Sequence, residues 1–357
     1  MTPRIVLVTG VSRYLGGRLV HALASDPSIE RVIGVDTAPP ARDLLSKLGR
    51  AEFVRADIRH PLIARVISSA KVDTVVHMNI SATPQGAGGR TAMKELNVMG
   101  TMQLLAAVQR SSSVQRLVVK SSSAVYGASP RDPALFTEDM QPKALSGGGF
   151  AKDAAEIESY VRGFSRRRPD VDVSMLRFSN FIGPHIDSIL TPYFSLPVIP
   201  TMLGYDARLQ LLHEDDAIGV LREVVLRSDG SANGVTNVAG DGVLLLSQAI
   251  RRAGRASVPV PPGAAQVAGK LVRSLGVADF SPEQMRFLNF GRVMDTTRMR
   301  EVLGFTPAYS TAEAFESFLT QRRLRPLPPM SWLVSALGAQ REQAEVRAEP
   351  DYSRGGR

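Results

Sequence analysis

The chain has 357 residues, of which 44% are hydrophobic and 22% charged, the ordinary balance of a globular protein with a sizeable core. It contains no cysteine, which excludes disulfides, thiolate nucleophiles and zinc–thiolate sites. The net charge of +9 favours anionic partners, but only 6% of the residues are aromatic, and the basic residues are not interleaved with them. Nucleic acid is therefore the weaker candidate, and a phosphate-bearing small molecule is the stronger one.

Neither a signal peptide nor a membrane span is expected. The apolar run Ile5–Val8 is much shorter than the apolar core of a secretory signal. No stretch approaches the roughly 18 uninterrupted apolar residues that a spanning helix needs. Together with the lack of cysteine, this predicts a soluble protein of the cytoplasm.

Short β-rich runs alternate with helical patterns through the first half of the chain. The predicted strands are residues 4–10, 31–36, 52–57, 74–79, 116–122 and 171–180. The predicted helices are residues 16–25, 41–49, 61–70, 91–111 and 148–168. Because the strands are nearly continuous apolar runs, helices should cover both faces of a parallel sheet. The pattern predicts a Rossmann-type, doubly wound α/β fold.

After about residue 180 this alternation ends and proline becomes frequent. We expect residues 1–180 to form the sheet domain and residues 181–330 to form a smaller lobe. A short strand predicted at 235–239 could return to the sheet, which would make the lobe discontinuous. Residues 331–357 are polar, end in Arg-Gly-Gly-Arg and are expected to form a mobile tail.

The segment VTGVSRYLGGRL joins the first strand to the first helix, where a dinucleotide-binding glycine motif belongs. Gly10 and Gly16 keep the outer positions of G-x-x-G-x-x-G, but Arg13 stands at the central one. Glycines there make the tight turn and let the backbone approach a pyrophosphate. Asp36 ends the second strand, where an acidic residue can bind the ribose hydroxyls. An aspartate at a strand end is often only a turn former, but the two features in register favour dinucleotide binding.

The choice between NAD and NADP rests on two residues. Asp36 would repel the 2′-phosphate of NADP and therefore favours NAD. Arg13 could instead recruit that phosphate, or pair with another phosphate of the cofactor. We predict NAD and leave NADP open.

Further segments follow in order along residues 4–310: RADIR, VDTVVHMN, LNVMGT, VKSSSAVYG, LRFSNFIGP, LLHEDDA, NVAGDG and EVLGFTP. With the glycine turn, they resemble the extended short-chain dehydrogenase/reductases, in particular the NAD-dependent epimerase/dehydratase family that includes UDP-glucose 4-epimerase. The resemblance implies hydride transfer between NAD and a nucleotide sugar. It makes residues 1–180 the NAD(P)-binding domain and residues 181–330 the substrate-binding lobe.

The resemblance also implies roles for single residues. The family's catalytic serine or threonine falls on Ser122, and its catalytic lysine, which also holds the nicotinamide ribose, falls on Lys152. The implied cofactor contacts are Gly10, Arg13, Leu15, Gly16, Asp36, Asp57 (at the adenine), Ile58, Asn97 and Lys152. The implied substrate contacts are Ser123, Asn180 and Arg208, of which Arg208 is one residue out of register with a phosphate-binding arginine of the family.

The segment SGGGFAKDAAEIE lacks the tyrosine that acts as the family's base, because Gly148 stands four residues before Lys152. Tyr126 belongs to the V-Y-G turn, and Tyr160 lies roughly 12 Å beyond Lys152 along a helix. Loss of a positioned base typically costs about 10²–10⁴-fold in rate, so Lys152, water or substrate could sustain a weak activity. We favour an enzyme. The alternative is a protein that binds NAD(P) without turnover, as a sensor or scaffold.

Two further features concern metals and assembly. The five histidines have no ligand spacing, so no metal site is expected, and the run His213-Glu214-Asp215-Asp216 fits a structural turn near the substrate. The helix at 91–111 is too apolar all round to cover only one sheet face, and the helix at 148–168 repeats apolar residues along its length. They resemble the family's four-helix dimer interface, so we predict a homodimer; the alternative is burial under the C-terminal lobe.

Overall fold

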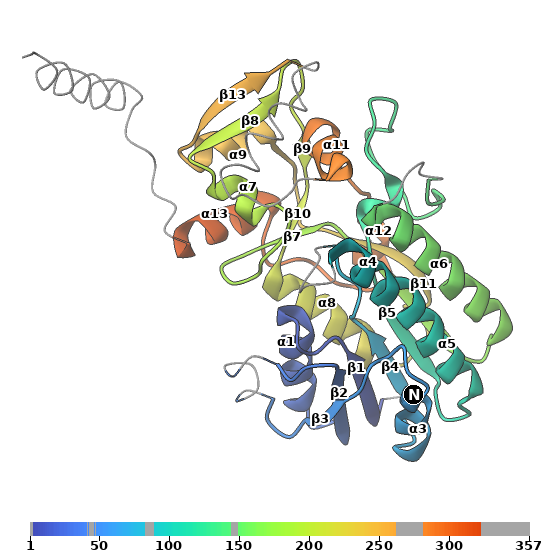
Figure 1. Ribbon diagram of the computed structural model, residues 1–357. Coiled ribbons are helices and arrows are strands. Elements are labelled where there is room, and N and C mark those ends of the chain that lie inside the picture. The colour runs from blue at the N-terminus through green and yellow to red at the C-terminus, as the bar shows by residue number, and fades with distance from the viewer. Residues whose placement is uncertain are drawn as a thin grey trace, which may run out of the picture.

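A seven-stranded parallel sheet lies at the centre of the protein (Figure 1). The computed structural model describes residues 3–40, 42, 46, 48–82, 89–143, 149–261 and 281–322. The strands of this sheet are β1 (Ile5–Thr9), β2 (Arg31–Asp36), β3 (Glu52–Arg55), β4 (Thr74–His77), β5 (Arg116–Ser122), β6 (Asp172–Phe178) and β11 (Gly234–Val238). Their order is β11-β6-β5-β4-β1-β2-β3. The winding reverses between β1 and β4, where doubly wound sheets open a crevice at the carboxyl ends of their strands.

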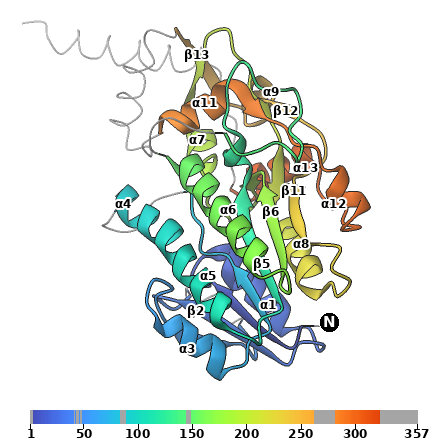
Figure 2. The same cartoon turned by 90° about the vertical axis from the view of Figure 1, so that its right-hand side faces the viewer.

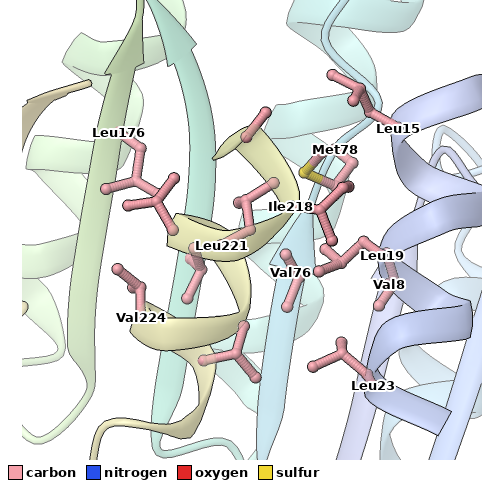
Figure 3. Close-up of a cluster of buried hydrophobic side chains, with 14 of the residues drawn as sticks. Val8, Leu15, Leu19, Leu23, Val76, Met78, Leu176, Ile218, Leu221 and Val224 are labelled. Carbon is pink, nitrogen blue, oxygen red and sulfur yellow. The ribbon is translucent and has the colours of Figure 1, made fainter. Parts of the chain in front are cut away.

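Helices cover both faces of this sheet, as its apolar strands require. α1 (Tyr14–Ala24) and α8 (Glu214–Leu226) pack on one face, where Figure 3 shows Leu19 and Ile218 close to Val76. α3 (Leu62–Ser69), α5 (Gly100–Arg110) and α6 (Phe150–Arg167) pack on the other face (Figure 2). The predicted Rossmann-type α/β fold is confirmed.

The helix predicted at 91–111 consists of successive parts. α4 (Gly89–Lys94) leads into a π-helical turn (Glu95–Met99), which continues as α5. The hydrophobic repeat reports which face is buried but not which backbone groups are bonded, so it does not predict the π-turn. Such turns are frequent at functional sites, and this one carries Asn97.

A second group of elements begins where β6 ends. Its strands pair in small sheets: β7 (Asn180–Ile182) with β10 (Leu211–His213), β8 (Val198–Met202) with β13 (Ala256–Val260), and β9 (Arg208–Leu209) with β12 (Leu244–Leu245) and β14 (Gly291–Arg292). The remaining helices are α7 (Thr191–Ser195), α9 (Leu246–Arg252), α11 (Pro282–Phe290), α12 (Thr297–Glu301) and α13 (Thr311–Gln321), and a 3₁₀ turn spans Ser123–Tyr126. Phe194, Phe315 and Phe318 are fully buried in the core of this lobe.

Two elements after residue 180 return to the main sheet. β11 pairs with β6, so the strand predicted at 235–239 joins the sheet. α8 packs against α1 in the core of the sheet domain. The second half of the chain is therefore shared between the sheet and the lobe.

Some predicted features fall outside the described residues: most of the helix at 41–49, the residue Gly148, and the tail at 331–357. Within the described ranges, no helix has both the length and the apolar character needed to cross a membrane.

Candidate functional site

Two glycines shape the turn between β1 and α1. Gly10 has φ +78°, a conformation that favours glycine, and a Cβ there would lie 2.9 Å from the backbone of Asn79. A Cβ on Gly16 would lie 2.1 Å from the carbonyl oxygen of Gly10. Arg13 precedes α1 with φ −86° and ψ 150°, which any residue adopts. The turn thus keeps both outer glycines of the motif, while its central position accepts a side chain without backbone strain.

The guanidinium of Arg13 crosses from this turn to the segment after β4. Its Nη1 donates a 2.8 Å hydrogen bond to Ser81 Oγ. Asn97 holds the main chain of Ser81: its Oδ1 accepts from the amide nitrogen at 3.0 Å, and its Nδ2 donates to the carbonyl oxygen at 2.9 Å. The predicted cofactor residue Asn97 therefore shapes one wall of the crevice with its side-chain amide engaged by the backbone.

A buried row of side chains joins β1, β4 and α5 beneath the crevice. Thr9 Oγ1 lies 2.8 Å from His77 Nδ1, and His77 Nε2 lies 2.9 Å from Thr101 Oγ1. Burial, together with the charge of Lys120, lowers the pKa of His77 to about 3, so its ring is neutral. His77 holds the strands in place and is not poised to exchange protons near neutral pH.

Asp36 supports the glycine turn from the end of β2. Its Oδ2 accepts hydrogen bonds from the amide nitrogen of Ser12 at 3.0 Å and from the Ser12 hydroxyl, and its Oδ1 accepts from the amide nitrogen of Thr37 at 2.7 Å. Only 6% of Asp36 is exposed. The carboxylate thus stabilises the turn residues Ser12 and Thr37, as an aspartate at a strand end often does. A ribose hydroxyl would bind to its remaining lone pairs.

The other predicted cofactor contacts are engaged within the fold. Asp57 follows β3 and forms an ion pair with Arg59 at 2.6 Å, which lowers the pKa of the aspartate. The side chains of Leu15 and Ile58 are buried in the clusters on the two faces of the sheet. These two side chains serve packing.

Lys120 is a component of the crevice that the sequence analysis missed. On β5, Ser121 donates a 2.7 Å hydrogen bond to Glu158 on α6. Because side chains alternate along a strand, Lys120 and Ser122 project from the opposite face. Burial and the positive charge of Arg13 lower the pKa of Lys120 to about 7. A lysine directly after the apolar run at residues 117–119 was the available signal in the sequence.

The predicted catalytic residues lie on neighbouring elements. Ser122 ends β5, and its Oγ accepts a 3.2 Å hydrogen bond from the amide nitrogen of Ala124. Lys152 lies in the first turn of α6 with an exposed side chain. α6 packs on β5 and on the 3₁₀ turn that follows Ser122.

A carboxylate from the lobe fills the space at the start of α6. Ala151 donates its amide hydrogen to Glu283, with distances of 2.9 Å to Oε1 and 3.2 Å to Oε2. A Cβ on Gly149 would lie 2.4 Å from Glu283 Oε2, so glycine at this position leaves room for the carboxylate. Burial raises the pKa of Glu283. The sequence gives no signal for this contact, because Glu283 is far away in the chain and belongs to no motif.

Arg292 connects the lobe to the 3₁₀ turn that follows Ser122. Its Nε donates to the carbonyl oxygen of Gly127 at 2.7 Å, and its Nη1 donates to Ser123 Oγ at 3.0 Å. Burial lowers the pKa of Arg292 to about 10. The predicted substrate residue Ser123 is therefore bonded to a buried arginine that no sequence motif indicated.

Arg208 and Arg292 both line a cavity of about 240 Å³ between the lobe and the loop that follows the 3₁₀ turn. Tyr205 and Phe290 supply aromatic walls, and Asp132 adds a carboxylate. The predicted substrate residue Asn180 lies elsewhere, half-buried at the start of β7. Of the predicted substrate residues, Arg208 lines this cavity, and Ser123 is hydrogen-bonded to Arg292, which also lines it. Asn180 is not among the residues that line the cavity.

A buried ion pair supports the strand that carries Ser122. Arg177 on β6 donates to Glu158 from Nη2 at 2.7 Å and from Nε at 2.9 Å, and neither side chain is exposed. Arg177 Nη1 also donates to Tyr126 Oη at 2.8 Å, and that hydroxyl donates to Asn237 Oδ1 at 2.7 Å. Burial raises the pKa of Tyr126. Tyr126 is therefore a structural member of this network.

Comparison with known proteins identifies the family. Residues 6–239 match the NAD dependent epimerase/dehydratase family. An uncharacterized protein of Mycobacterium tuberculosis is 51% identical over 325 residues, which cover 91% of this chain and 86% of that protein. A UDP-glucose 4-epimerase of Mycolicibacterium smegmatis is 27% identical over 324 residues, covering 86% of this chain and 95% of the relative.

Solved structures show the same fold. A UDP-glucose 4-epimerase from Stenotrophomonas maltophila, with bound NAD and a formylated UDP-arabinopyranose, matches with a TM-score of 0.69 at 19% identity over 90% of this chain and 98% of the other. A UDP-glucuronic acid 4-epimerase from Bacillus cereus, in complex with UDP-glucuronic acid and NAD, matches with a TM-score of 0.68 at 18% identity over 90% of this chain and 100% of the other. The glycine turn, the order of the motifs and these matches agree, and the protein belongs to the NAD-dependent epimerase/dehydratase family of extended short-chain dehydrogenase/reductases.

Proposed function

We propose that this protein is an NAD-dependent enzyme that transfers hydride to and from a nucleotide sugar or a similar anionic alcohol. The observation that carries the proposal is that the glycine turn, Ser122 and Lys152 lie at the carboxyl edge of one parallel sheet. Relatives and structural neighbours named UDP-glucose 4-epimerase support this class of substrate. In this proposal residues 1–180, with β11 returning, bind the dinucleotide, and residues 181–330 supply the substrate lobe.

The residues of the crevice fit a dinucleotide. α1 begins directly after the glycine turn, and a helix N-terminus favours an anion such as a pyrophosphate. Arg13 and Lys120 add positive charge, and Asp36 stands where it can select NAD over NADP. Asn97 keeps the crevice wall in place, and Lys152 would hold the nicotinamide ribose. When bound, the nicotinamide would accept and return the hydride.

The proton chemistry must use a group other than the family's tyrosine. Oxidation of a hydroxyl needs an acceptor for its proton, and Ser122 would orient that hydroxyl. Tyr126 is engaged by Arg177 and Asn237. The proton would therefore pass to Lys152, to a water molecule or to Glu283, whose raised pKa and place at the start of α6 add it to the candidates. We expect turnover about 10²–10⁴-fold below that of an enzyme with a positioned base.

A second candidate function is binding without turnover. Arg13 at the centre of the glycine motif and Gly148 in the tyrosine position favour it. The protein would then bind the dinucleotide as a sensor or scaffold, and the lobe would contact another molecule in a way that depends on whether the dinucleotide is bound.

Mass spectrometry of the purified protein under native conditions tests the proposal. We expect retained NAD(H), with or without a nucleotide sugar. A protein that retains no dinucleotide and binds none at millimolar concentration would contradict both candidate functions.

A further inference from the structure

Within the described residues, Lys120 has no counter-ion; it lies near the carboxyl end of β5 with a partly exposed side chain. It projects from β5 on the same face as Ser122, the face that α1 and α8 cover, because Ser121 points to α6. Across the part of the chain that the structure describes, no side chain or backbone group forms a hydrogen bond or an ion pair with its ammonium.

The charged groups around Lys120 do not compensate it. Arg13 from the β1–α1 turn is itself a cation, and His77 from β4 is neutral. Asp36 faces Arg13, but its two oxygens already accept hydrogen bonds from Ser12 and Thr37. A poorly solvated charge without a partner is costly, and such groups gather where a ligand completes them. An anionic ligand would supply such a partner.

The two cations flank the point where the sheet reverses its winding. Arg13 reaches from the end of β1 to Ser81, which follows β4, and Lys120 rises from β5 on the other side of β4. Doubly wound sheets hold a dinucleotide in this crevice, with a central glycine that lets the backbone approach the pyrophosphate. Here that glycine is Arg13.

We propose that Arg13 and Lys120 together bind the diphosphate of the dinucleotide through side-chain ion pairs, which replace the close backbone contact of the glycine motif. This inference rests on the proposed function, and it adds a binding residue, Lys120, that the glycine motif does not supply.

Binding should then take up a proton. The pKa of Lys120 is lowered to about 7 in the free protein, so at about pH 8 its amine is mostly neutral. An adjacent diphosphate raises that pKa, and the amine gains a proton as the ligand binds. Affinity is therefore highest below the free pKa. It falls by up to about tenfold per pH unit above it, until the pKa of the complex is reached.

Calorimetry in buffers of different ionisation enthalpy measures this proton directly. Wild type and Lys120→Met are titrated with NAD⁺, ADP-ribose, UDP-glucose and inorganic pyrophosphate at about pH 6.5, 8 and 9. Lys71→Met is the matched control, because Lys71 is an exposed lysine that precedes β4 at the opposite edge of the sheet. We expect up to one proton taken up with NAD⁺ and ADP-ribose at about pH 8 by wild type and by the control, and none by Lys120→Met. At about pH 6.5, Lys120→Met should bind about tenfold more weakly.

Arg13→Gly tests the pairing of the two cations. It restores the glycine motif and removes the charge that helps to lower the pKa of Lys120. The midpoint of the pH dependence should therefore move to higher pH, which a purely structural role of Arg13 does not predict. Melting curves without ligand show whether each variant folds, and Lys120→Met should melt higher than wild type at about pH 6.5, because an unpaired charge is gone.

The outcomes separate this inference from the proposed function. Unchanged proton uptake in Lys120→Met contradicts the ion pair. If a proton is taken up with UDP-glucose but not with NAD⁺, Arg13 and Lys120 bind the diphosphate of the substrate, and the assignment to the dinucleotide is wrong. If wild type binds neither NAD⁺ nor ADP-ribose at any pH, the proposed function itself has failed.

Discussion

At the scale of single residues, the start of α6 holds the main departure from the family's catalytic pattern. Gly148 lies outside the described residues, but its neighbour Gly149 begins the helix beside the carboxylate of Glu283. This carboxylate accepts the hydrogen bond of Ala151 that a capping side chain at the helix start would otherwise accept. The lobe thus completes the helix start at the place where the family carries its base.

Restoring the tyrosine tests this departure. In Gly148→Tyr, a phenol would stand four residues before Lys152. α6 begins at Phe150, so the phenol shares a face with Lys152 once the helix extends back to residue 148. We expect unchanged NAD binding and hydride transfer raised by about 10²-fold or more, while Lys152→Ala lowers activity in either background. The rate of hydride transfer is measured as the single-turnover reduction of bound NAD by a nucleotide sugar. Family-typical rates in wild type that are lost in Gly148→Tyr would show that the glycine admits a substrate group or another base.

Asp36 makes a second prediction at this scale. Asp36→Ala should reduce the preference for NAD over NADP, because it removes the charge that repels the 2′-phosphate. It should also lower the free energy of unfolding by about 1–3 kcal/mol, since Ser12 and Thr37 lose a charged acceptor. Calorimetry with both cofactors and urea unfolding measure the two effects. If wild type binds NADP more tightly than NAD, Arg13 rather than Asp36 determines which cofactor is preferred.

Single residues were predicted from the sequence only where a local motif contains them. Gly10 and Gly16 were predicted to shape the turn, and the backbone geometry shows why each must be glycine. Glu283 reaches the start of α6 from the lobe, and Arg292 reaches the 3₁₀ turn after Ser122; no local pattern encodes such long-range contacts. Lys120 lies within the segment VKSSSAVYG, but its importance depends on burial and on the charge of Arg13, which only the fold reveals.

At the scale of elements, the pair Arg177–Glu158 holds β5, β6 and α6 together beneath Ser122. Glu158 also accepts the hydrogen bond of Ser121, and Arg177 also binds Tyr126, which reaches Asn237 on β11. The network therefore links the end of β5 to α6, β6, the 3₁₀ turn and β11.

Removing one partner of this pair should be costly. Glu158→Ala leaves Arg177 buried without its anion, and we expect a loss of about 3–5 kcal/mol in the free energy of unfolding. The control Glu156→Ala, two positions earlier on the same helix, removes only a partly buried contact to Tyr160 and should cost about 0.5 kcal/mol. Urea unfolding compares the two. Equal losses in the free energy of unfolding would mean that the buried pair stabilises the protein no more than the partly buried contact does.

The elements themselves were largely predicted, because apolar periodicity reports burial directly. β2 and β5 match the predicted bounds, and α6 begins two residues later than expected, after its glycines. The π-turn around Asn97 was not predicted, since it depends on which backbone groups bond. The lobe was predicted only as an interruption of the pattern, because its strands are too short to show a period.

At the scale of the whole molecule, exposed apolar side chains mark a surface on the helices at 89–110. Leu104, Leu105 and Val108 are buried against the sheet, whereas Met99 is 55% and Met102 is 46% exposed. α5 lies beside α6 in both views (Figures 1 and 2). The alternative in which the lobe buries this face does not account for the exposed methionines.

We predict that this surface forms the homodimer. Light scattering at micromolar concentration should give twice the mass of the chain. Met99→Glu with Met102→Glu should yield a folded monomer, because charges at the centre of an apolar interface are not paired. The control Leu203→Glu changes an equally exposed apolar residue of the lobe and should leave the mass unchanged. A wild type that is monomeric under these conditions contradicts the dimer.

The central claim is that this site still transfers hydride without the family's tyrosine. The most direct test incubates the native protein with NAD⁺ and a UDP-sugar deuterated at the carbon that is oxidised, and follows deuterium in the bound cofactor by mass spectrometry. We predict slow transfer of deuterium to the nicotinamide, which Lys152→Ala slows further. If cofactor and sugar both bind and no deuterium moves within hours, the protein binds its ligands without turnover, and the enzymatic account is wrong.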